Sequence, residues 1–83
     1  MDTILEARSL LARVLEVPLD IVGHKDSLYT LEMWDSLAHI RIILELEHVL
    51  NTELTTEQVL SVENVVDIAK LLDSLYTNNA LHG

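Results

Sequence analysis

Hydrophobic residues recur every three to four positions along most of the chain, which is the spacing of one face of an α-helix. Polar residues fill the positions between them, and the sequence holds only one proline and two glycines. We therefore predict an all-α fold with helices over residues 3–16, 36–50, 56–61 and 64–76. The tail that follows, residues 77–83, is expected to fray.

Polar residues at the predicted helix starts support these boundaries. Thr3 and Glu6 have the spacing of a capping box, and so do Thr55 and Gln58. Asn64 is placed to cap the last helix. Such side chains accept hydrogen bonds from the backbone N–H groups that the first turn of a helix leaves unpaired.

The first connection, residues 17–35, is long and irregular. Pro18 and Gly23 interrupt the helical spacing, and we expect only one short helical turn, near Leu28–Leu31. A connection of this length in so small a domain is usually functional or closely packed.

The helix predicted over residues 36–50 has two apolar strips when it is drawn at about 100° per residue. The main strip is typical of a helix that faces a core, and it comprises His39, Ile42, Ile43, Leu46, Val49 and Leu50. A second apolar strip, Leu37, Ile40 and Leu44, lies outside it. Either the helix packs on two neighbours, or the second apolar strip is exposed and docks a partner.

Length and charge narrow the classes of function. The 83 residues make a single domain, residues 1–83, with a thin core. Fourteen acidic residues against five basic ones give a formal net charge of −9. Nucleic acid and anionic membranes attract basic proteins, so neither is an expected partner, whereas a basic protein surface is.

The sequence has no cysteine, which excludes disulfides, thiolate metal sites and cysteine nucleophiles. No apolar run is long enough for a membrane span or the core of a signal peptide. We expect a free-standing cytoplasmic protein. The histidines are scattered, and no metal site is predicted.

The tripeptide Asp35-Ser36-Leu37 opens the helix with two strips. A helix N-terminus presents unpaired N–H groups and a positive dipole end, which favour a bound phosphate. The alternative is that Asp35 or Ser36 only caps the helix. The same tripeptide occurs at residues 26–28 and 73–75, but only Ser36 opens a long amphipathic helix after a long connection.

From Thr3 to Tyr76 the chain resembles the acyl carrier protein family. The resemblance centres on Trp34-Asp35-Ser36-Leu37-Ala38-His39-Ile40 and continues through residues 44–50, and residues 64–72 look like the last helix of that family. It implies a stand-alone, monomeric four-helix bundle of acyl-carrier type that is not an enzyme. The bundle would have three main helices and one short helix, and the first loop would be long.

In that family a phosphopantetheinyl transferase moves a 4′-phosphopantetheine arm from coenzyme A to the serine of the motif, using magnesium. The resemblance thus implies covalent attachment at Ser36, with Asp35 and Leu37 beside it as part of the cofactor-binding motif. The terminal thiol of the arm would carry an acyl or aminoacyl group as a thioester. Enzymes of fatty-acid, polyketide or other specialised biosynthesis would load and process it.

The resemblance also implies roles for the rest of the second helix. Basic docking patches on partner enzymes would meet a surface made of Leu37, Ile40, Arg41, Leu44, Glu45, Glu47 and Glu57. An acyl chain would be sheltered among His39, Ile43, Leu46, Leu50 and Leu54. The alternative for these five residues is an ordinary, filled core.

Two departures from the family pattern separate this chain from many fatty-acid carriers. Met33 and Trp34 stand where many of those carriers have a Gly-Leu pair, and Arg41 stands where an acidic residue is common. The motif looks more like that of certain stand-alone carriers of specialised pathways.

The sequence leaves one function of a different class open and argues against another. A small acidic interaction module without a covalent group would use the second apolar strip alone. A hydrolase built from Asp35, Ser36 and His39 would lack the relay geometry of a triad, because Asp35 and Ser36 are consecutive. We therefore predict no catalytic residue.

Overall fold

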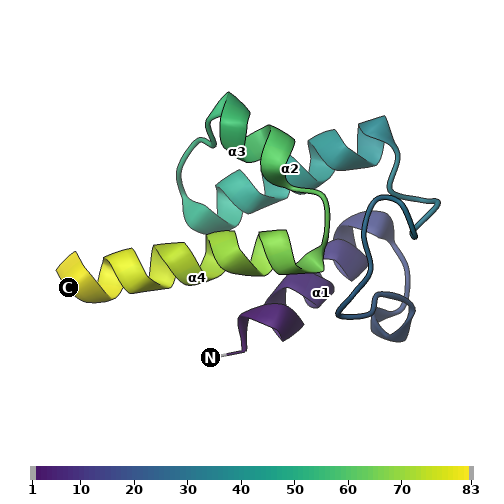
Figure 1. Cartoon of the computed structure of the whole chain (residues 1–83), viewed down its shortest axis with the longest axis horizontal. Helices are drawn as coiled ribbons and strands as arrows, with labels where there is room; N and C mark the ends of the chain where they lie inside the picture. The colour runs from purple at the N-terminus through teal and green to yellow at the C-terminus, as the bar shows by residue number, and fades with distance from the viewer. Residues whose placement is uncertain (1, 83) are drawn as a thin grey trace.

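The chain folds into four α-helices in a computed structural model, which describes the backbone of residues 2–82 and the side chains of residues 2–74. The described backbone contains no β-strand beyond one isolated bridge, so the predicted all-α class is confirmed. The helices are α1 (Thr3–Leu15), α2 (Ser36–Leu50), α3 (Thr56–Ser61) and α4 (Val65–His82) (Figure 1). The ranges of α2 and α3 are those expected from the sequence.

One hydrophobic core joins the three long helices, and α1 packs against both α2 and α4. The most deeply buried large side chains are Leu11 of α1, Ile42 and Leu46 of α2, and Val65, Ile68 and Leu72 of α4. Leu31 and Trp34 of the first connection are buried in the same core. The long connection is thus a packed part of the domain and not a free loop.

The helix starts carry the expected kind of cap, with one correction. At α1, Asp2 and not Thr3 is the cap, because its carboxylate accepts a hydrogen bond from the Leu5 N–H at 3.1 Å. Thr3 already lies inside the helix. At α3, Thr55 and Gln58 form the reciprocal capping box that their spacing indicated.

Asn64 caps α4, since its side-chain oxygen accepts from the Asp67 N–H at 2.8 Å. The sequence predicted that this last helix ends at residue 76, whereas α4 continues to His82. The expected fraying of the tail stays a prediction. Residues 65–82 contain neither proline nor glycine, so no helix-breaking residue ends α4 earlier.

The first connection is held in place by hydrogen bonds to α1 and to the start of α4. A short 3₁₀ helix at Leu19–Ile21, which the sequence did not reveal, is tied to α1 by the guanidinium of Arg8. That group donates to the Val22 carbonyl at 2.6 Å. The expected turn near residues 28–31 is present as a hydrogen-bonded turn rather than as a helix.

An isolated bridge fastens the connection to the start of α4. The Leu28 N–H donates to the Glu63 carbonyl at 2.9 Å, and the Val65 N–H donates to the Asp26 carbonyl at 3.1 Å. Through this bridge, residues that are more than thirty positions apart lie side by side at the end of the molecule where α2 begins.

Candidate functional site

At the start of α2, the hydroxyl group of Ser36 takes no part in capping the helix. Asp35 is the N-cap: its Oδ1 accepts from the Ala38 N–H at 2.8 Å, and its carbonyl accepts from the His39 N–H at 2.8 Å. Ser36 is the first residue of the helix, it is exposed, and its hydroxyl makes no hydrogen bond with the side chains and backbone that the structure describes. Asp35 therefore does the capping, and Ser36 stays available for chemistry.

The same helix end favours negative charge beside Ser36. The first N–H groups of an α-helix have no intrahelical acceptor, and the helix dipole places partial positive charge there. A phosphate group bonded to the Ser36 oxygen would meet both.

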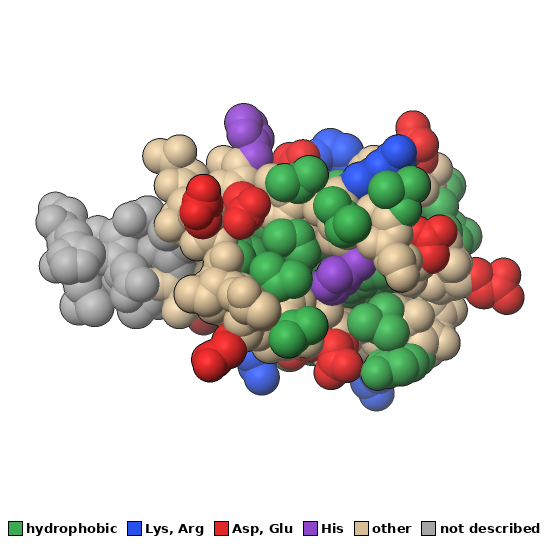
Figure 2. Space-filling view, turned by 90° about the horizontal axis from the view of Figure 1, so that it is seen from above, with side chains coloured by type: hydrophobic (Ala, Val, Ile, Leu, Met, Phe, Trp, Pro, Cys, Tyr) green, Lys and Arg blue, Asp and Glu red, His purple; other side chains and the backbone are tan. Residues whose placement is uncertain are grey.

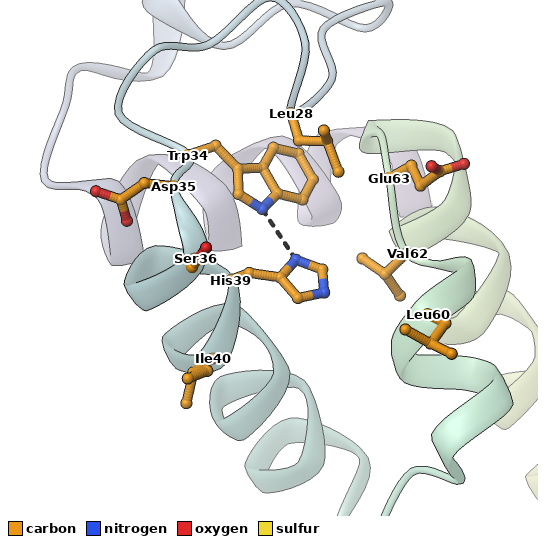
Figure 3. Close-up of a pocket in the computed structure, with 9 residues that line it drawn as sticks. All are labelled: Leu28, Trp34, Asp35, Ser36, His39, Ile40, Leu60, Val62 and Glu63. Atoms are coloured by element: carbon orange, nitrogen blue, oxygen red, sulfur yellow. Dashed lines mark hydrogen bonds between the residues drawn. The ribbon is translucent and has the colours of Figure 1, made fainter.

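A pocket of about 600 Å³ opens beside Ser36. We call it the Ser36 pocket. Ser36, His39 and Ile40 of α2 line one side, and Leu60, Val62 and Glu63 lie across from them (Figure 3).

Leu28 and Trp34 of the first connection complete the apolar part of the lining. Figure 3 shows the Trp34 and His39 rings meeting between α2 and Val62, while the Asp35 carboxylate turns away from them. Most of the pocket wall is thus apolar, with Ser36 at its edge.

Trp34 and His39 are joined by a hydrogen bond whose direction is fixed by chemistry. The indole Nε1 lies 3.1 Å from Nδ1 of His39, and an indole N–H can only donate. Nδ1 of His39 must therefore be the acceptor and carry no proton. The two rings are also nearly parallel, at 19° between their planes and 6.1 Å between their centres.

The other ring nitrogen of His39 continues the link to α3. Nε2 lies 3.2 Å from the Val59 carbonyl, and a carbonyl only accepts, so Nε2 carries the proton of a neutral imidazole. We call this arrangement the Trp34–His39–Val59 link. It connects the first connection, α2 and α3 through a half-buried histidine.

With both nitrogens engaged, His39 has no lone pair to offer to the Ser36 hydroxyl. Asp35 is equally engaged as the helix cap. The three residues thus do not form a catalytic relay, which needs the imidazole between the nucleophile and the carboxylate.

The far wall of the pocket carries a second polar contact. The Tyr29 hydroxyl donates to the carboxylate of Glu63 at 3.2 Å. This hydrogen bond and the negative charge of Glu63 raise the pKa of Tyr29 above its ordinary value. Tyr29 is largely exposed, so the contact braces the rim of the pocket rather than its interior.

The second apolar strip of α2 is exposed. Leu37, Ile40 and Leu44 are 59%, 57% and 59% exposed, so they do not pack on a second neighbour. Figure 2 shows hydrophobic side chains gathered around a histidine on one face of the molecule, with acidic side chains at the edges of that face. An apolar strip that starts next to Ser36 is typical of a docking surface.

Some of the charged residues beside this strip are bonded to other groups of the chain, and others are not. Glu45 pairs with Arg13 of α1 at 2.9 Å, and the Glu47 carboxylate accepts from the Leu54 N–H at 2.8 Å. Arg41 and Glu57 are exposed and form no ion pair among the described side chains. Of the four charged residues predicted to bind partners, Glu45 and Glu47 are thus engaged within the chain, and Arg41 and Glu57 are not.

The five residues that we expected around an acyl chain do not share one cavity. His39 lines the Ser36 pocket, whereas Ile43, Leu46 and Leu50 are buried in the core. Leu54 is half-buried, and with Leu50 it borders a separate pocket of about 230 Å³ that Ser36 does not line.

A comparison with protein-family models decides the identity of this site. The model described as "Phosphopantetheine attachment site" matches residues 6–72. The chain belongs to the phosphopantetheine attachment site family. No curated protein matches it significantly.

Domains of this family are the sites of covalent 4′-phosphopantetheine attachment, and they are carriers rather than enzymes. This carrier therefore takes its prosthetic arm from a phosphopantetheinyl transferase and serves biosynthetic enzymes. In the described part of the carrier, no group of three or more metal-ligating side chains occurs, and no helix has the length and apolar character to cross a membrane.

Several pocket residues of the carrier escaped the sequence analysis. Leu28, Leu60, Val62 and Glu63 come from two segments that the bridge to α4 brings together. No local pattern marks them, because only the fold makes them neighbours of Ser36. Trp34 stood out only as a departure from the family pattern, although its indole N–H was a clue, since a buried indole usually finds an acceptor.

The Trp34–His39–Val59 link predicts a single tautomer of His39. NMR correlations between the imidazole nitrogens and the ring protons should show a proton on Nε2 and none on Nδ1 in the folded carrier. Replacing Trp34→Phe removes the indole donor and should let Nδ1–H become populated, whereas Tyr29→Phe should not. A protonated Nδ1 in the unaltered carrier would show that the link does not exist.

Proposed function

We propose that the protein is an acyl carrier protein that holds acyl or related groups as thioesters on a 4′-phosphopantetheine arm bonded to Oγ of Ser36. One observation carries the assignment to this residue. Ser36 is exposed at the first position of α2, and Asp35 has taken over the capping that would otherwise engage a serine hydroxyl.

The residues around Ser36 fit the arm. The N-terminal N–H groups of α2 favour the negative charge of the phosphate, and Leu37 lies beside it at the start of the second apolar strip. When bound, the arm supplies a terminal thiol, which the cysteine-free chain lacks. The chain itself positions and presents that thiol.

We also propose that partner enzymes dock on α2 and α3. The exposed strip, Leu37, Ile40 and Leu44, supplies an apolar centre that begins next to Ser36. Arg41 on α2 and Glu57 on α3 flank it with free charges of opposite sign. A partner then reads a mixed pattern rather than a uniformly acidic helix, which supports a specialised biosynthetic pathway over bulk fatty-acid synthesis.

Attachment at Ser36 predicts a mass gain that depends on one hydroxyl. Incubation with coenzyme A, magnesium and a broad-range phosphopantetheinyl transferase should add the mass of one 4′-phosphopantetheine group, as measured on the intact protein. Ser36→Ala should abolish the gain. Ser74→Ala, which alters the same tripeptide inside α4, is the matched control and should leave the gain unchanged.

Two outcomes would count against this assignment. A gain that persists in Ser36→Ala would place the arm elsewhere. A chain that takes up no arm at all would support the simpler function of an interaction module that uses the exposed strip alone.

Reversing the charge of Glu57 and reversing that of Arg41 should have opposite effects on the rate of arm transfer. At low ionic strength, Glu57→Lys should slow transfer by a transferase with a basic patch by about two- to tenfold, and Arg41→Glu should speed it by a similar factor. Both effects should shrink at high salt, because screening removes long-range steering. Rates that do not depend on either substitution would rule out steering by these side chains.

A further inference from the structure

The Ser36 pocket opens at the surface and borders the hydrophobic core. Trp34 and Val62 line the pocket and also belong to the core cluster, and His39 is bonded to Trp34 at this boundary. On one side of His39 are Ser36 and the open pocket. One and two turns further along the same strip of α2 are Ile42, Ile43 and Leu46, which are at most 8% exposed and belong to the core cluster. A chain that left Ser36 and moved inward along this strip would meet His39 first.

His39 is not free to move aside. It accepts from the Trp34 indole at 3.1 Å and donates to the Val59 carbonyl at 3.2 Å. Trp34 is only 4% exposed, so displacing the imidazole would leave a buried indole N–H without its acceptor, and the Val59 carbonyl would keep only the bond from the Val62 N–H at 3.4 Å. Buried polar groups without partners are costly, so the link resists opening.

An acyl chain that entered the core would have to displace side chains that are already packed together. Leu46, Val65 and Ile68 have no accessible surface, and they come from two different helices that pack on α1. Protein interiors are close-packed, so a guest of several methylenes must push these helices apart.

We propose that the Trp34–His39–Val59 link closes the interior to the cargo and confines it to the Ser36 pocket, so that the carrier is built for a short acyl or aminoacyl group. This inference rests on the proposed attachment at Ser36. The pocket offers such a cargo an apolar wall made of Leu28, Leu60 and Val62. A long chain gains no further burial there and extends into solvent.

The test loads the full-length protein with acyl arms of three lengths. A broad-range phosphopantetheinyl transferase would transfer the arm from butyryl-, octanoyl- or hexadecanoyl-coenzyme A, and hydroxylamine cleavage of each thioester would be followed by intact mass. We expect similar cleavage rates for all three. If the chain entered the core, each added buried methylene would slow cleavage by roughly fourfold, the fold-change that matches the transfer free energy of one methylene.

Variants of the link test whether it is the barrier. Trp34→Phe removes the indole donor and keeps an apolar ring, and His39→Ala removes the imidazole. In both, octanoyl and hexadecanoyl thioesters should become more protected than butyryl. His48→Ala changes an exposed histidine on the same helix and should behave as the unaltered protein.

The outcomes separate this inference from the proposed attachment. Arm uptake with protection that grows with chain length in the unaltered protein would overturn the closure and leave Ser36 as the attachment site. Length-independent cleavage in a folded Trp34→Phe variant would show that the link is not the barrier. No uptake of any arm would overturn the attachment itself, and this is read from the mass before cleavage begins.

Discussion

The hydrogen bond from the Ala38 N–H to the Asp35 carboxylate decides what Ser36 can do. Every helix start needs an acceptor for its unpaired N–H groups, and a serine in this position often provides one with its own hydroxyl. Here Asp35 provides the acceptor. Ser36 is the next residue, inside the helix, and its exposed hydroxyl is therefore not needed for capping. The positive end of α2 and the second apolar strip then begin at the same residue, which places phosphate binding and partner docking side by side.

A second set of hydrogen bonds separates this surface from the interior. Trp34 belongs to the first connection, His39 to α2 and Val59 to α3, so the link between them fixes three segments relative to one another. The bridge between the first connection and the start of α4 fixes the opposite wall of the pocket. A small domain with a thin core can thus display a reactive arm without opening that core.

The sequence predicted the elements well because its local patterns are strong. Asp35, Thr55 and Asn64 each mark a helix start by a polar side chain of the right kind, and α2 and α3 span the expected residues. The error at Thr3 arose because Asp2 is an equally good cap one position earlier, and only the backbone geometry distinguishes them. The proposed attachment at Ser36 rested instead on the resemblance to the carrier family, because a serine beside a helix start is also compatible with a simple cap.

The rest of the site could not be predicted, because it depends on contacts between distant residues. Arg13 and Glu45 are 32 positions apart, and no pattern indicated that this pair holds a carboxylate which we had expected to face partners. The pocket wall at Leu28 and Glu63 likewise exists only through the bridge to α4. Periodicity assigned His39 to the core strip, but its role as the divider between pocket and core needed the positions of Trp34 and Val59.

We propose that an arm bonded to Ser36 lies in the Ser36 pocket and not in the core. The most direct measurement is a comparison of NMR chemical shifts between the unmodified protein and the protein that carries 4′-phosphopantetheine. We expect chemical-shift changes at Ser36, at the Trp34 indole and along residues 60–63, and none at Leu46 and Ile68. Large changes at Leu46 and Ile68, with residues 60–63 unaffected, would contradict it.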